Sequence, residues 1–234
     1  MSPTLMAVTA IAVAAGGLLQ GSIGVGFALV MSPLLAIVAP SLLPGCVLIL
    51  MLPLNAYVAW REWPHIDWPG TRRITLGRCL GAVAGLALLA ALSVGALRVF
   101  VGVATLLAAG ASLLVGSFTP GRVGFGLAGL ITGVTETATG IGGPPLALVY
   151  QNHAGPVLRS TLAMCFLIGQ LVSLALLALT ARLTFAQIEA SVLLLPARLF
   201  GALLSRLLHG RLDGRPLRIA MLVFAMVSGL VCFV

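Results

Sequence analysis

The stretch Thr139-Gly140-Ile141-Gly142-Gly143-Pro144-Pro145 lies in the middle of a long apolar segment, where a membrane helix is expected to be continuous. In a helix interior, Gly costs about 1 kcal/mol and Pro about 3 kcal/mol relative to Ala. The two prolines also lack the backbone N–H group that a helix needs. The stretch therefore predicts a helix break at membrane depth. Such breaks are tolerated only inside protein or beside a watery cavity, so this one is a candidate binding site.

A weaker form of the same pattern occurs earlier in the chain. Residues 17–21 and 24–26, followed by Pro33, resemble residues 129–133 and 140–143, which are followed by Pro145. Two interrupted apolar segments at corresponding places in two halves are the best sequence indication of a transporter's binding site. We therefore predict two related membrane repeats, residues 1–118 and 119–234, within one integrated transmembrane domain.

The composition is that of an integral membrane protein. The chain has 234 residues, of which 60% are hydrophobic and 8% are charged, and its mean hydropathy is +1.18. A soluble domain has about 25% charged residues. No charged residue occurs among residues 1–60, a run that is too long for a signal peptide. We expect the protein to be inserted in the membrane.

The charged and sulfur-containing residues exclude several classes of function. All 13 basic residues are Arg, and the absence of Lys excludes a Walker phosphate loop and Schiff-base chemistry. The Arg residues lie between apolar spans, as orientation signals do, so we expect no nucleic-acid partner. The four Cys residues form no C-x-x-C pair, and we expect no metal and no cofactor. Without a catalytic constellation, an enzyme is not expected.

The apolar segments predict an all-α fold in which each half has one broken or hairpin helix element and three transmembrane helices. A spanning helix needs about 20 apolar residues, and the arms at residues 4–19 and 27–39 are shorter. The predicted broken elements are residues 4–39 and 123–150, and the predicted spans are residues 45–60, 79–97, 99–121, 160–181, 185–208 and 217–234. A polar loop is expected at residues 61–78, and an interruption of a span at Pro196 and Arg198.

The distribution of Arg predicts that the halves are inverted. If each broken element returns to its own side, the loops near residues 61–78, 122, 152–159 and 206–218 share one face. That face then holds ten Arg residues, and the other keeps Arg98 and Arg182. The positive-inside rule favours this arrangement, with both termini facing away from the cytoplasm.

Glycines in one further segment predict helix packing. Gly77, Gly81 and Gly85 are four residues apart, so they lie on one face of a helix. Small residues on one face allow another helix to approach closely. We predict packing within the chain, with a homodimer contact as the alternative.

The breaks offer groups that bind anions. The backbone N–H groups of Ile141, Gly142 and Gly143 are able to converge on an anion as a nest does, and the helix that follows has a positive N-terminal end. Thr139 and Gly140 belong to the same site. The mirrored break and the polar residues of the spans add Gln20, Ser22, Gly24, Val25, Gly26, Asn55 and Gln170 to the predicted substrate-binding residues. The alternative is that the glycines allow close packing and the amides join helices.

Two charged residues, Glu136 and Arg198, lie inside predicted membrane segments and away from their ends, whereas Glu189 lies near the end of a span. A charge at the centre of a membrane costs about 2.5–3.5 kcal/mol on insertion scales. Glu136 is either a coupling or gating group or one partner of a structural ion pair, for which Arg198 is the candidate. Arg198 is either that partner or a substrate ligand, because the guanidinium fork suits a tetrahedral anion.

These motifs resemble the sulfite exporter TauE/SafE family of membrane proteins, also called TSUP. The resemblance covers nearly the whole chain and is most specific at residues 138–146, 21–27 and 66–68 and in the tail from Pro196 to Arg218. It implies a multi-pass transporter of the bacterial inner membrane that moves sulfite, sulfonates or related organosulfur anions.

We therefore expect a secondary transporter that binds a small anion near the midplane and exposes it alternately by rocking of the two halves. The alternatives are an uncoupled anion channel or facilitator and a non-transporting assembly subunit. A coupling proton or sodium ion and a homodimer are left open.

Overall fold

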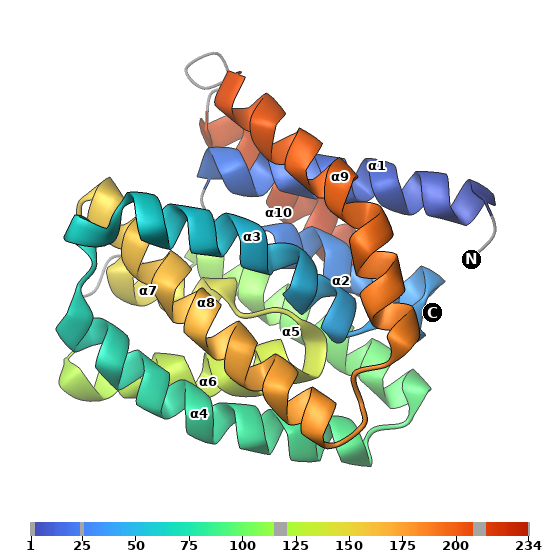
Figure 1. Cartoon of the computed structure of the whole chain (residues 1–234), viewed down its shortest axis with the longest axis horizontal. Helices are drawn as coiled ribbons and strands as arrows, with labels where there is room; N and C mark the ends of the chain where they lie inside the picture. Colours follow the sequence, from blue (N-terminus) through green and yellow to red (C-terminus); the bar gives the residue numbers. More distant parts are fainter. Residues whose placement is uncertain (1–2, 24–25, 115–120, 208–213, 234) are drawn as a thin grey trace.

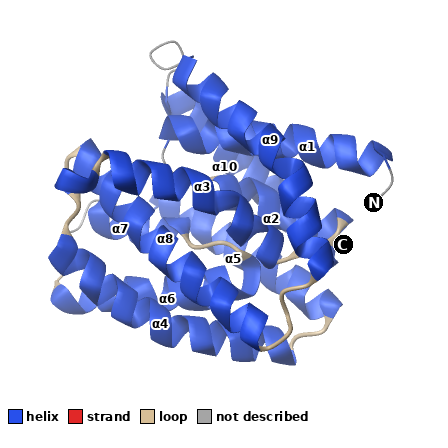
Figure 2. Cartoon of the chain, viewed as in Figure 1, coloured by secondary structure: helices blue, strands red, loops and turns tan. Residues whose placement is uncertain are grey.

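The computed structural model describes residues 3–23, 26–114, 121–207 and 214–233, a part of the chain that is helical and contains no strand (Figure 2). Two 3₁₀ turns, Pro40–Leu42 and Trp63–His65, lie between helices. The α-helices are α1 (Pro3–Ile23), α2 (Phe27–Val38), α3 (Gly45–Arg61), α4 (Trp68–Ala91), α5 (Val94–Leu114), α6 (Arg122–Thr139), α7 (Gly143–Tyr150), α8 (Gly155–Leu179), α9 (Phe185–Leu207) and α10 (Gly214–Val231). The prediction of an all-α fold is confirmed.

The helices form two outer pairs with further helices between them (Figure 1). Helix α1 packs along α9 at the top of that view, and α4 packs along α6 at the bottom. Between these pairs, α3 packs against α8 and α5 packs against α10. When α1–α5 are matched in order with α6–α10, the α4–α6 contact corresponds to the α9–α1 contact. The fourth helix of each half therefore packs on the first helix of the other half.

The surface and interior are those of a membrane-embedded protein. Among the described residues, four helical segments are long and apolar enough to cross a bilayer: Trp68–Ala91, Val94–Leu113, Gly155–Leu179 and Phe185–Ser205. Large apolar side chains are exposed on α4, α5, α6 and α9, including Leu76, Leu80, Leu107, Ile131, Leu193 and Leu203. Soluble monomers rarely expose large apolar patches. Several polar side chains are instead buried, so the chain is an all-α integral membrane protein.

The prediction of a polar loop over residues 61–78 was wrong. Helix α4 already begins at Trp68, because the Asp67 carboxylate caps it by accepting a hydrogen bond from the Gly70 N–H at 3.2 Å, and Pro69 lies in its first turn. Capping residues and a first-turn proline favour such a start. Arg78, which the charge count assigned to a loop, is therefore a buried residue of α4 with 2% exposure.

Two further helix boundaries differ from the prediction for the same reason. Helix α5 begins at Val94, so Arg98 lies on the helix and does not separate two spans. Helix α9 runs without a break through Pro196 and Arg198. Charged and proline residues were taken as ends of helices, although a membrane helix keeps either when neighbouring helices satisfy its polar groups.

The predicted glycine packing is confirmed. A Cβ atom added at Gly77 would lie 2.9 Å from the Leu130 nitrogen, and one at Gly85 would lie 3.0 Å from the Val134 Cα. A Cβ at Gly81 would lie 3.0 Å from the Cα of Gly133. The glycines therefore bring the backbones of α4 and α6 into direct contact.

Candidate functional site

The predicted break in the second half is present and buried. Helix α6 ends at Thr139, and Gly140 follows in the left-handed conformation with φ of 83°. The hydroxyl of Thr132 donates to the carbonyl of Gly142 at 3.2 Å. Helix α7 then begins at Gly143 with prolines in its first turn. The non-helical backbone is thus held inside protein, as membrane depth requires.

Backbone donors at this break are used unequally. The N–H of Ile141 donates to the hydroxyl of Thr139 at 3.1 Å, so the protein itself uses one of the three predicted donors. The N–H groups of Gly142 and Gly143 lie just before and at the start of α7, where backbone donors have no partner within the helix. The hydroxyls of Thr137 and Thr139 also bond within the protein, to Ser173 and to the Thr135 carbonyl.

The break in the first half lies between α1 and α2. Helix α1 ends at Ile23 and α2 begins at Phe27, while Gly26 adopts φ of 124°, which favours glycine. Gly24, Val25 and the side chain of Ser22 lie outside the described residues. Their predicted role therefore stays a prediction.

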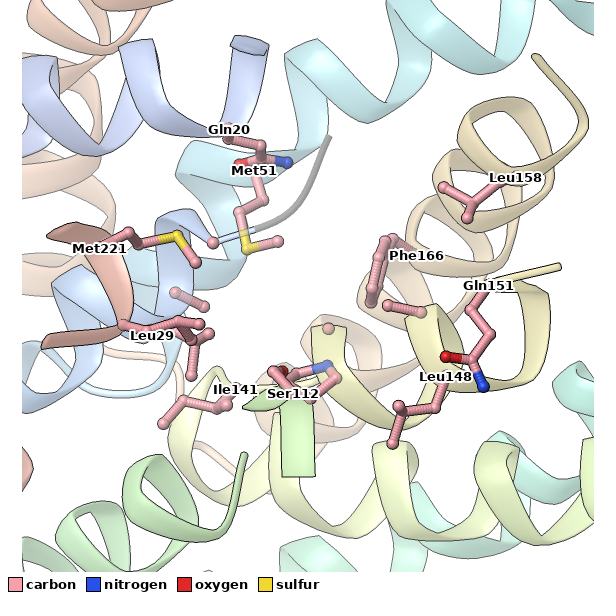
Figure 3. A pocket seen from close by; sticks show the side chains of 16 residues that line it. Gln20, Leu29, Met51, Ser112, Ile141, Leu148, Gln151, Leu158, Phe166 and Met221 are labelled. Carbon is pink, nitrogen blue, oxygen red and sulfur yellow. The ribbon is translucent and has the colours of Figure 1, made fainter. Parts of the chain in front are cut away.

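A cavity of about 400 Å³ connects the two breaks. The first break contributes Gln20 and Gly26 to its lining, and the second contributes Ile141, Gly143 and Pro144. In Figure 3, Gln20 and Phe166 lie on opposite sides of the space. Further lining residues come from other helices and include Leu29, Met51, Ser112, Gln151 and Met221. Small-molecule sites commonly have volumes of about 300–1,000 Å³ and mostly apolar walls with a few polar groups.

On one side of the cavity, a buried network surrounds Glu136. Arg78 Nη2 forms an ion pair with Glu136 Oε2, and both side chains are almost fully buried. Gln170 Nε2 donates to Glu136 Oε1 at 3.0 Å, and Asn55 Nδ2 donates to Gln170 Oε1 at 3.1 Å. The Arg78 guanidinium carbon lies 5.4 Å from the centre of the Phe166 ring, and Phe166 lines the cavity. The carboxylate is therefore paired and oriented by three helices.

This network corrects the predicted partner of Glu136. The ion pair joins α6 to α4, not to α9, so Arg198 is not its counter-ion. Arg78 was missed because it was placed in a loop. The capping signal Asp67-Trp68-Pro69 would have placed it on a helix, on the third turn and within the glycine-lined face.

On the other side, Arg198 is buried and has no acidic partner in the part of the chain that the structure describes. It is 1% exposed, and its Nη2 donates to Gln20 Oε1 at 2.8 Å. Its guanidinium carbon lies 4.4 Å from the centre of the Phe27 ring, at the start of α2. Among the described residues, its Nε and Nη1 have no hydrogen-bond partner. A buried cation with two unused donors is thus held by a neutral residue that lines the cavity.

The structure brings some predicted ligands together and separates others. Gln20 and Arg198 meet at the first break, and Asn55 and Gln170 meet beside Glu136. The two amides bond to each other and to the carboxylate, as helix-joining amides do. Of the predicted residues that the structure describes, Gln20, Gly26, Ile141 and Gly143 line the cavity, and Asn55, Gln170 and Arg198 do not.

Comparison with protein-family models gives a match over nearly the whole chain. The model of the family described as "Sulfite exporter TauE/SafE" matches residues 8–232. Searches of curated proteins and of solved structures found no significant match.

Proposed function

The chain belongs to the sulfite exporter TauE/SafE family, and from this premise we propose that it is a secondary transporter for sulfite, sulfonates or related organosulfur anions in the bacterial inner membrane. Membership implies membrane transport of sulfur anions such as sulfite, which is consistent with a protein that is not an enzyme. The anion binds in the cavity between the two helix breaks.

The observation that carries this proposal is the buried Arg198. An ionised side chain at membrane depth is costly and marks a function when nothing neutralises it. Here the partner is the neutral Gln20, and the donors Nε and Nη1 remain unused in the described part of the chain. A planar guanidinium binds two oxygens of an oxyanion at once. Arg198 therefore supplies the main positive charge of the site.

The second break contributes from the opposite wall. The N–H groups of Gly142 and Gly143 lie at the N-terminal end of α7, and such an end carries a partial positive charge. Gly143 and Pro144 line the same cavity as Gln20. A small anion bound there is held by one side chain and by backbone dipoles, and no metal or cofactor is needed.

Alternating access follows from an inverted arrangement of the halves, which the exchanged packing partners support. The connection from α3 to α4 lies at the left of Figure 1, and the turns from α4 to α5 and from α8 to α9 lie at the right. Arg61, Arg72 and Arg159 belong to helix ends at the α3–α4 and α7–α8 connections. The side of the molecule that holds the α3–α4 and α7–α8 connections is therefore the cytoplasmic side under the positive-inside rule.

Transport in proteoliposomes tests the proposal. Purified full-length protein is reconstituted, and uptake of labelled sulfite, taurine, sulfoacetate and sulfate is measured with and without a pH or sodium gradient. Saturable uptake of a sulfur anion that a gradient accelerates supports a coupled transporter. Saturable uptake without any gradient dependence identifies a facilitator, and non-saturable current identifies a channel. No movement of any anion contradicts the proposal and favours an assembly subunit.

A further inference from the structure

The two buried arginines are held in the same way in the two halves. Arg78 on α4 bonds to Glu136 on α6, and Arg198 on α9 bonds to Gln20 on α1. In both cases Nη2 alone makes the bond, and Nε and Nη1 have no partner among the described residues. Both guanidinium groups also lie over a phenylalanine ring.

The backbones beside these arginines correspond as well. Gly17 and Gly133 each lie three residues before the acceptor residue, Gln20 or Glu136. A Cβ added at Gly17 would lie 2.8 Å from the Arg198 carbonyl oxygen and 3.4 Å from the Ala202 nitrogen. A Cβ at Gly133 would lie 2.5 Å from the corresponding oxygen of Arg78. In the sequence, residues 17–21 were matched with residues 129–133. In the structure Gly17 corresponds to Gly133, so that match was wrong by one helical turn.

At these equivalent positions the acceptors differ in charge, and the phenylalanine rings come from different helices, Phe166 from α8 and Phe27 from α2. Glu136 is a carboxylate, which neutralises Arg78 and accepts a second hydrogen bond from Gln170 at 3.0 Å. Gln20 is an uncharged amide of nearly the same shape, so Arg198 stays without a negative partner in the described chain. The protein thus contains one arginine site that holds an oxyanion and one that does not.

We propose that Glu136 is a resident anion, which supplies to Arg78 the negative charge that the transported oxyanion supplies to Arg198 through the unused Nε and Nη1 donors. This inference rests on the proposed function for the identity of the transported anion. The Glu136 carboxylate shows how an oxyanion is held here, by the guanidinium of one helix and the amide of another. Each protein molecule consequently binds one sulfur anion, at Arg198, and the site at Arg78 is closed to substrate by its own side chain.

Exchange of the two acceptors tests this inference. Full-length protein in detergent is titrated with sulfite by calorimetry, and its melting temperature is measured without sulfite. Wild type is expected to bind one sulfite. Q20E places a carboxylate on Arg198, so it is expected to bind none and to melt at a higher temperature. E136Q opens the Arg78 site, so it is expected to bind two sulfite ions and to melt at a lower temperature.

The matched control is the double variant R78Q/E136Q, which removes both charges of the second site and is expected to bind one sulfite. One sulfite bound by E136Q, or normal binding by Q20E, overturns the inference. If E136Q does not fold, Q20E alone decides it. If wild type binds no sulfite, the proposed function fails for this anion. The inference is then judged by melting alone. Q20E must raise the melting temperature, and an unchanged or lower melting temperature overturns the inference.

Discussion

Replacing each buried arginine by glutamine separates a structural arginine from a ligand-binding one. In R78Q, the Glu136 carboxylate stays buried and keeps only the Gln170 amide as a partner. Removing one partner of a buried ion pair costs about 3–5 kcal/mol. At about 2–4 °C per kcal/mol for a chain of this size, the melting temperature should fall by about 6–20 °C.

In R198Q, no carboxylate is left unpaired, because the partner of Arg198 is the neutral Gln20. The variant loses the contact with the Phe27 ring, which is worth about 0.5–2 kcal/mol, and it no longer buries a cation, which costs about 2.5–3.5 kcal/mol on insertion scales. The net effect is a gain of about 0.5–3 kcal/mol, so the melting temperature should rise by about 1–12 °C.

Transport should show the opposite order. R198Q removes two charge-assisted hydrogen bonds to the anion, each worth about 1.5–3 kcal/mol, so sulfite uptake in proteoliposomes should fall by at least about 100-fold. The two variants are compared by melting in detergent and by uptake at equal protein content. A fall in melting temperature for R198Q as large as that of R78Q, or normal uptake by R198Q, would refute the reasoning.

Three more variants follow from the structure. In G142V, the added Cβ would lie 2.9 Å from Thr132 Cγ2 and 3.0 Å from Glu136 Cδ, so we expect membrane insertion with loss of uptake; normal uptake by an inserted G142V protein would contradict a role for the break. G133L drives a side chain into the backbone of α4 and should prevent folding, as fluorescence-detected size-exclusion chromatography would show, whereas G110A meets no atom within 4 Å and should elute as wild type; equal elution of both variants argues against the packing. Y150F loses the hydrogen bond from the Tyr150 hydroxyl to Asp67 Oδ2 at 2.7 Å, so melting in detergent should show a loss of about 1.5–3 kcal/mol, as for bonds to charged groups; an unchanged melting temperature would show that this bond contributes nothing.

The sequence predicted those features that local chemistry determines. Three glycines and two prolines within six residues do not continue a helix, so the end of α6 at Thr139 and the start of α7 at Gly143 followed from residues 139–145 alone. The glycine face of α4 likewise predicted close packing. Neither pattern says which helix is the neighbour, because any backbone can approach a glycine.

The parts that were missed depend on contacts between distant segments. Arg78 and Glu136 are separated by 58 residues, and only the packing of α4 on α6 brings them together. Arg198 was paired with Glu136 because both are charged, but α9 packs on α1. The predicted helix boundaries were wrong where an Arg was taken to mark a solvent-exposed loop. An Arg can also lie inside a helix when a buried partner or a bound anion satisfies its charge.

The glycine contacts limit which parts of the molecule move as rigid bodies. The most intimate backbone contacts join α4 to α6 and α1 to α9, and each of these pairs takes one helix from each half of the sequence. If residues 1–118 rocked against residues 119–234, both of these interfaces, which we call seams, would have to slide. The glycine contacts at the seams leave no room even for an added Cβ atom. We therefore expect alternating access to move cross-half pairs, α1 with α9 and α4 with α6, with the hinge in the broken elements between them. Two separately expressed halves would each lack both seams.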